Sequence, residues 1–148
     1  MSSQIATTAV RGRFLDIQHT VAQAHEIDDQ VRYVEDGLII MQDGKIQWFG
    51  SWDEGQKHLA ENIQVAHYPE QLIVPGLIDT HIHFPQTEMV GAYGEQLLEW
   101  LNTYTFPTEI QFADTAYSEK IAEFFVQELL KNGTTTALVF CTVHPESV

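Results

Sequence analysis

The sequence predicts an α/β protein made of two parts, residues 1–73 and residues 74–148. The first part shows short strands with tight turns, the pattern of part of a β-sandwich. The second part shows an apolar strand ending in two histidines, then an amphipathic helix that leads into a β-branched run. A strand, a helix and a strand in that order are typical of a unit in a parallel sheet.

The clearest signal in the first part is a hairpin within residues 33–50. Two apolar runs flank Asp43-Gly44, a dipeptide that accepts the positive φ angles of a type I′ turn. The remaining elements expected before residue 74 are strands at 9–17 and 64–67, a loop at 19–29 and a short surface helix at 52–61.

The second part begins with a strand that enters through Pro75 and runs to His83. Proline is tolerated at the start of a strand because its missing N–H need not join the ladder there. A helix over residues 96–104 is expected to stop before Pro107, because the residue before a proline disfavours the helical conformation.

A longer helix is predicted over residues 115–131. Asp114 is a suitable N-cap, and Asn132-Gly133 supplies the expected C-cap. Apolar residues recur along one face of the helix: Ile121, Phe124, Phe125 and Leu129. The run at 134–143 then predicts a buried strand, in which Cys141 would be a small core residue.

Composition limits the classes of partner. The 148 residues carry 7 Lys+Arg against 21 Asp+Glu, a formal net charge of -14, so binding to nucleic acid is disfavoured. One cysteine excludes an intramolecular disulfide and a cysteine-based zinc ribbon. Neither a membrane span nor an apolar signal segment is visible, and we therefore expect a cytoplasmic protein without a membrane partner.

His81 and His83 are the candidate metal ligands. Side chains alternate along a strand, so both imidazoles point to the face of Asp79, while Ile82 points to the opposite face. Two imidazoles at the end of a strand form half of a metal site. Alternatively, one histidine faces a helix and the other is simply buried and hydrogen-bonded. Asp79 is expected to accept hydrogen bonds rather than bind metal, since a lone buried carboxylate is costly.

His144 follows the second apolar strand and is expected to be an exposed histidine at the rim, with metal binding as the alternative. The other histidines show no ligand spacing: His19, His25, His58 and His67.

These residues carry a resemblance to a known family. Pro75-Gly76-Leu77-Ile78-Asp79-Thr80-His81-Ile82-His83 resembles the first barrel strand of the amidohydrolase superfamily. Three later blocks resemble its guanine deaminase branch: Phe84-Pro85-Gln86, Leu98-Glu99-Trp100-Leu101 with Tyr104-Thr105-Phe106-Pro107-Thr108-Glu109, and Lys131-Asn132-Gly133-Thr134-Thr135-Thr136. The resemblance is clear from about residue 74 to 147 and loose before it.

The resemblance implies a (β/α)8 TIM-like barrel and zinc-dependent hydrolysis of guanine to xanthine and ammonia, a step of purine catabolism. His81 and His83 would bind Zn2+ and the metal would activate a water. His83, Phe84, Pro85 and Gln86 would contact the substrate, with the Gln86 carboxamide on the purine edge. Trp100 would shape the pocket wall or, more simply, pack its own helix.

A chain of 148 residues is too short to contain the whole of such an enzyme. A (β/α)8 barrel takes about 250 residues, and a catalytic zinc takes at least three protein ligands. We therefore expect an N-terminal piece, inactive alone, with an aggregation-prone strand edge. The remaining ligands and the acid–base Glu and Asp would follow in later strands, so no catalytic residue is assigned here.

Two alternatives stay open. One is a related amidohydrolase, a deaminase or chlorohydrolase that acts on another nucleobase or a triazine. The other is a small free-standing metal-binding or interaction module that uses His81 and His83, with His144 as an optional third ligand. The partners expected for the full-length protein are a small-molecule substrate, guanine, and a second copy of itself in a homodimer.

Overall fold

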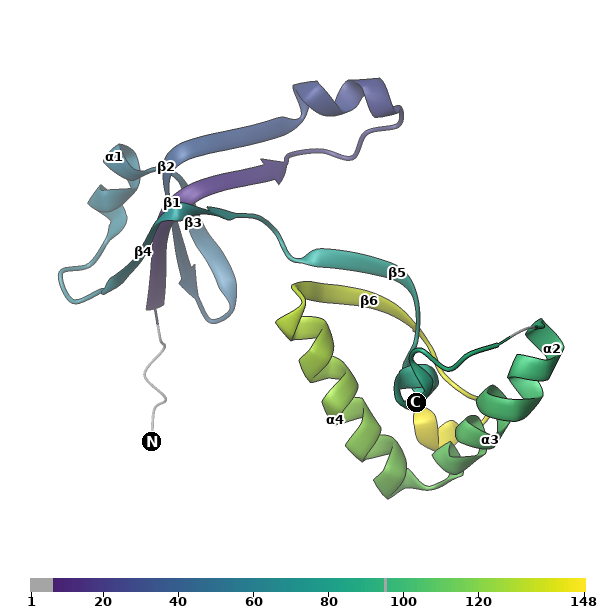
Figure 1. Ribbon diagram of the computed structural model, residues 1–148. Coiled ribbons are helices and arrows are strands. Elements are labelled where there is room, and N and C mark those ends of the chain that lie inside the picture. Colours follow the sequence, from purple (N-terminus) through teal and green to yellow (C-terminus); the bar gives the residue numbers. More distant parts are fainter. Residues whose placement is uncertain (1–6, 95) are drawn as a thin grey trace. The chain divides into compact units, whose positions relative to one another are not determined.

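The computed structural model describes residues 7–94 and 96–148 and divides into two compact units, residues 1–75 and 76–148 (Figure 1). Each unit has its own hydrophobic core. The division falls between Pro75 and Gly76, in the short connection between a strand of the first unit and a strand of the second.

The first unit is built on one four-stranded sheet in the order β3-β2-β1-β4. Its strands are β1 (Thr7–Ile17), β2 (Val31–Gln42), β3 (Lys45–Ser51) and β4 (Val65–Ile73). Strand β2 pairs antiparallel with β1 and with β3, whereas β1 and β4 are parallel. The central positions of β1 and β2 explain why these strands carry the buried residues Ala9, Leu38 and Ile40.

The predicted hairpin is confirmed. Gln42 pairs with Lys45 across a two-residue turn, and both turn residues have positive φ, 54° at Asp43 and 70° at Gly44. These are the signs that a type I′ turn requires, and its twist matches that of the flanking strands.

Three elements of the first unit differ in length from the sequence prediction. The loop at 19–29 contains a 3₁₀ helix, Ala24–Asp29, and the strand expected at 64–67 extends to Ile73 through its pairing with β1. The surface helix is only α1 (Trp52–Gly55), followed by a 3₁₀ turn. Gly55 disfavours a long helix, and a Cβ there would lie 2.2 Å from the Trp48 ring.

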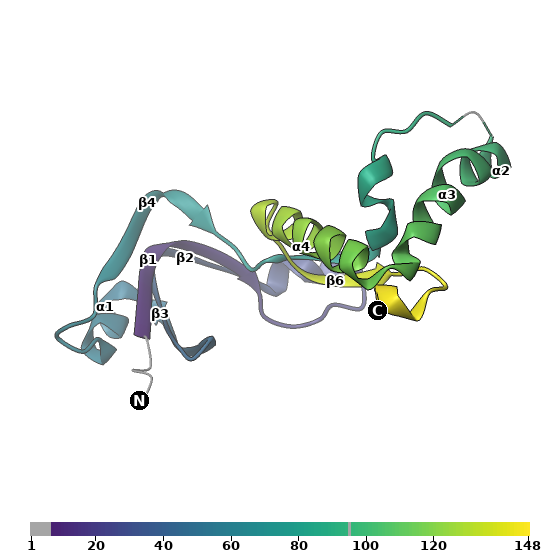
Figure 2. The same cartoon turned by 90° about the horizontal axis from the view of Figure 1, so that it is seen from below.

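The second unit contains the predicted parallel strand–helix–strand unit. Strands β5 (Leu77–His83) and β6 (Thr134–Phe140) pair in parallel, and α4 (Thr115–Lys131) lies along the pair (Figure 2). The helix boundaries match the prediction. The Asp114 carboxylate accepts the Tyr117 N–H at 3.0 Å, and after α4 the chain turns through Gly133 at φ 83°.

Aromatic residues form the core of the second unit. Phe84, Phe112, Ile121 and Phe125 are buried together, and the Phe84 and Phe112 rings meet edge to face at 5.1 Å. Ile82 and Leu129 pack against this cluster. The helix face read from the sequence is therefore the packed one, except that Phe124 is half exposed.

The helix before Pro107 does not stop as expected. Instead α2 (Leu97–Trp100) runs through a π-helical turn, Leu101–Thr105, into α3 (Phe106–Glu109). The Phe106 N–H donates to the carbonyl five residues back, at Leu101. Pro107 then lies in the first turn of α3, where a missing N–H breaks no bond within that helix.

A strand is present within residues 134–143 as expected, but the expectation that it is buried was wrong. Strand β6 ends at Phe140, Leu138 is 61% exposed and Cys141 is exposed. Within the described residues β6 pairs with β5 alone, so much of its surface lacks a cover. Strand β5 likewise begins at Leu77, whose N–H makes a 2.8 Å bond to the Gly133 carbonyl, rather than at Pro75. No helix in the described ranges is both long and apolar enough to cross a bilayer.

Candidate metal and substrate site

Strand β5 brings the two predicted metal ligands together at its carboxyl end. The Nε2 atoms of His81 and His83 lie 3.2 Å apart, and Ile82 between them points into the core. The Asp79 carboxylate accepts the His81 backbone N–H at 3.0 Å. The alternation of side chains along β5 thus places both imidazoles on one face of the strand and the Ile82 side chain on the other, in the core.

Phe140 of β6 packs against both imidazoles. It pairs with His83 in the strand register, and its ring centroid lies 4.7 Å from that of His81 and 5.1 Å from that of His83. An aromatic side chain here restricts the rotamers of both histidines without competing for their nitrogen atoms. The pair is consequently held in a defined arrangement by the sheet itself.

The distance between the two Nε2 atoms fits a shared zinc ion. Zinc–nitrogen bonds of 2.0–2.1 Å at a tetrahedral angle place two ligand nitrogens about 3.3 Å apart. The observed separation is 3.2 Å. Among the residues the structure describes, no group of three or more His, Cys, Asp or Glu side chains surrounds one point. Two imidazoles are fewer than the three protein ligands that a catalytic zinc site takes.

A cavity of about 690 Å³ adjoins the histidine pair, within the range of small-molecule sites. His81 and His83 line it, and so does Ile82, whose side chain lies on the opposite face of the strand. The other polar residues of the lining are Gln86, Thr87, Glu128 and Asn132.

The four residues expected to contact the substrate separate into two pairs. His83 and Gln86 line the cavity. Phe84 and Pro85 are buried and lie outside the lining, Phe84 within the aromatic core. All but His83 belong to the 3₁₀ helix Phe84–Met89, so the two buried residues anchor the turn that presents Gln86.

Two contacts that the sequence did not reveal hold this segment in place. The Tyr117 hydroxyl donates to Glu88 at 2.5 Å, and the Trp100 indole N–H donates to the Ala92 carbonyl at 3.3 Å. Burial and the Glu88 carboxylate raise the pKa of Tyr117 to about 12. The partners are 29 and 8 residues apart in sequence, and no periodicity marks such pairs.

His144 lies apart from this arrangement. It is half buried at the start of a 3₁₀ turn, Pro145–Ser147, and its backbone N–H donates to the Thr142 hydroxyl at 3.0 Å. In the described part of the chain, no hydrogen bond connects its ring with His81 or His83.

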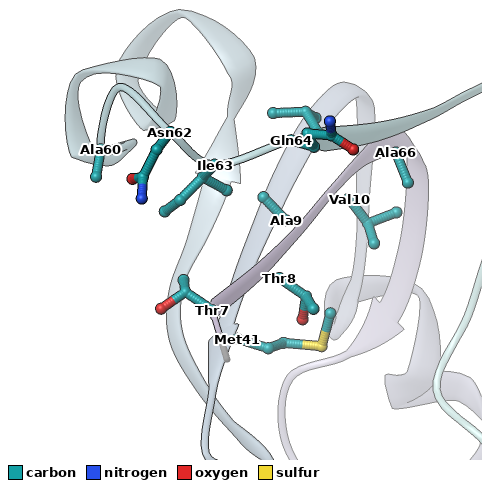
Figure 3. A pocket seen from close by; sticks show the side chains of 11 residues that line it. Thr7, Thr8, Ala9, Val10, Met41, Ala60, Asn62, Ile63, Gln64 and Ala66 are labelled. Atoms are coloured by element: carbon teal, nitrogen blue, oxygen red, sulfur yellow. The ribbon is translucent and has the colours of Figure 1, made fainter. Parts of the chain in front are cut away.

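The first unit has an open hollow of its own, of about 1010 Å³, between the start of β1 and the chain that leads into β4 (Figure 3). Its lining is apolar or uncharged, as with Thr8, Val10, Met41, Ile63 and Gln64. Among the residues that the structure describes, no titratable side chain lines it, so we assign no chemistry to it.

The chain belongs to the amidohydrolase family, whose model matches residues 72–148. Guanine deaminase of Escherichia coli (strain K12) is 53% identical over all 148 residues, which make up 34% of that protein. The chain therefore spans about a third of the length of this relative.

Two solved structures of guanine deaminases are also similar to this chain. The E. coli guanine deaminase structure matches 95% of this chain and 32% of its own at a TM-score of 0.89 and 54% identity. A guanine deaminase from C. acetobutylicum with bound guanine in the active site matches 96% of this chain and 32% of its own at a TM-score of 0.73 and 29% identity. The fold is accordingly a partial β-sandwich followed by the first β/α units of an amidohydrolase barrel, which this chain does not complete.

Proposed function

We propose that this chain supplies two zinc ligands and one wall of the substrate pocket in an enzyme that hydrolyses guanine to xanthine and ammonia. The 3.2 Å approach of the His81 and His83 Nε2 atoms beside a cavity carries the proposal. The similarity to guanine deaminases over the full length of the chain supports guanine as the substrate. Residues 1–73 would be the β-sandwich portion and residues 74–148 the start of the barrel.

The two histidines would bind the metal as neutral imidazoles. A nitrogen that binds metal must be unprotonated, so the remaining ring proton belongs on Nδ1 of each histidine. The hydrogen bond from the His81 backbone to Asp79 fixes the strand end, and Phe140 limits rotation of both rings. A bound zinc would supply Lewis-acid chemistry and lower the pKa of a water.

Gln86 would orient the purine. Its carboxamide offers both a donor and an acceptor, which suits the amide-like edge of guanine. The hydrolysis adds water at the purine carbon that bears the amino group and breaks the carbon–nitrogen bond, releasing ammonia. As the family resemblance implies, the acid–base Glu and Asp would come from later barrel strands outside these 148 residues.

The test is ammonia release by the purified gene product that contains these 148 residues. We expect activity with guanine and little with adenine, cytosine or a chlorinated triazine. Activity with another compound of this panel, without activity on guanine, would overturn the substrate and favour the related-amidohydrolase alternative. We also propose that the protein is cytoplasmic and forms a homodimer. Fractionation of the cell extract tests the location, and the molecular mass of the purified protein in solution tests the homodimer.

The module alternative has a separate test on the 148-residue chain. Two histidines provide fewer ligands than a structural zinc site needs, so we expect weak zinc binding and poorly cooperative melting. Tight, stoichiometric zinc with cooperative unfolding would favour the free-standing module instead.

A further inference from the structure

Trp100 contacts the backbone of a loop that borders the candidate site. Its indole N–H donates to the Ala92 carbonyl at 3.3 Å. A Cβ added to Gly94 would lie 2.2 Å from the Trp100 Cδ1 atom, so the ring packs directly on the glycine backbone. The indole thus meets the loop twice, by a hydrogen bond and by close packing.

The same loop is continuous with the turn that carries Gln86. The Ala92 N–H donates to the Met89 carbonyl at 3.0 Å, and Met89 is the buried last residue of the 3₁₀ helix Phe84–Met89. Both polar backbone groups of Ala92 are therefore occupied, one by Trp100 and one by Met89. A displacement of the indole would be passed through this turn to Gln86.

On the side that faces solvent, few other contacts restrain the loop of residues 89–94. Val90 is 86% exposed and Tyr93 is 74% exposed. Gly91 has a φ of 82°, a conformation that most other residues adopt only with strain. Apart from its chain neighbours, no atom of the described residues lies within 4 Å of the position that a Cβ on Gly91 would take. Trp100 is also outside the buried aromatic cluster and lines the cavity itself.

We propose that Trp100 is a positioning residue that holds residues 89–94 in place and thereby sets where Gln86 stands relative to His83. The inference rests on the proposed function, since it concerns how that site recognises a purine. Its effect falls on substrate binding, because the contact acts on the recognition turn and leaves the histidine pair untouched.

The test uses the whole gene product and two variants that disturb the contact from opposite sides. Trp100→Phe removes the indole N–H, and Gly94→Ala adds a methyl group that the ring must avoid. For each we expect KM for guanine to rise about three- to tenfold, the worth of one hydrogen bond, with kcat within about twofold of the parent. Trp48→Phe, a tryptophan of the first unit, is the control and should leave KM unchanged.

A double-mutant cycle with Gln86→Ala separates positioning from simple packing. If Trp100 acts through Gln86, the KM effects of Trp100→Phe and Gln86→Ala combine to less than their product. Independent effects, or an equal loss of kcat and stability with KM unchanged, would overturn the inference. A parent enzyme inactive on guanine would instead refute the proposed function. In that case, the change of Trp100 fluorescence on adding xanthine, compared with Trp100→Phe, still tests whether the residue lines a purine site.

Discussion

The Nε2 atoms of His81 and His83 lie 3.2 Å apart on one face of β5. Two imidazoles at this distance, if both were protonated, would repel each other, whereas a shared cation satisfies both lone pairs. The same distance suits a hydrogen bond between two neutral imidazoles, in which one Nε2–H donates to the other Nε2, and a bound metal would replace that proton.

Replacing either histidine by alanine should remove the metal. For His81→Ala and His83→Ala in the gene product, we expect loss of bound zinc after dialysis and a fall in ammonia release of at least about 100-fold. Elemental analysis and the ammonia assay measure the two effects. His19→Ala, an exposed histidine of the first unit, is the control. Full zinc occupancy in either variant would contradict the assignment.

Gln86→Ala should weaken guanine binding. The loss of a paired donor and acceptor is expected to raise KM about tenfold while zinc content stays at the parent level. Steady-state kinetics and elemental analysis are the measurements, with the exposed Gln111→Ala as the control. An unchanged KM would mean that Gln86 only borders the cavity.

Phe112→Ala should destabilise the second unit. Phe112 is fully buried in the aromatic cluster, so the substitution leaves a cavity and should cost about 3–5 kcal/mol. Phe106, which is 52% exposed, is the matched control and should cost less than about 1 kcal/mol as alanine. Urea unfolding of the whole gene product that contains these residues compares the two variants. Equal effects would show that the cluster is not the core.

The Tyr117 phenol should lose its proton at a higher pH than an ordinary tyrosine. Its pKa is raised to about 12 by burial and by the Glu88 carboxylate, from an ordinary value of 10.0. A raised pKa means that the folded state retains the proton, so the stabilisation is complete below pH 10 and is lost as the pH rises towards 12. Ultraviolet titration should show a tyrosine that ionises near pH 12, and this signal should be absent from Tyr117→Phe. Loss of stability between pH 10 and 12 should be smaller in that variant.

The local elements were predictable where one short signal decides them. Asp43-Gly44 defines the hairpin, and Asp114 with Asn132-Gly133 defines the limits of α4. Strand alternation at His81 and His83 was enough to place both imidazoles on one face. In each case the relevant interaction lies within a few residues of the signal.

Features that depend on distant partners were not predictable. The contact of Glu88 with Tyr117 joins two elements whose spacing carries no pattern. The exposure of Cys141 depends on which surfaces cover β6, and an apolar run alone does not reveal that. The continuation past Pro107 required a π-helical turn, for which the sequence has no signal that we recognised.

The pairing of β5 with β6 has a consequence for the order of folding. The β2–β3 hairpin closes over two residues and can form in microseconds, but His83 meets Phe140 only after the whole segment 84–133 has folded back. The imidazole pair therefore gains its aromatic support late. A substitution in the segment between the two strands can therefore loosen the imidazole pair although it lies far from both histidines in the sequence.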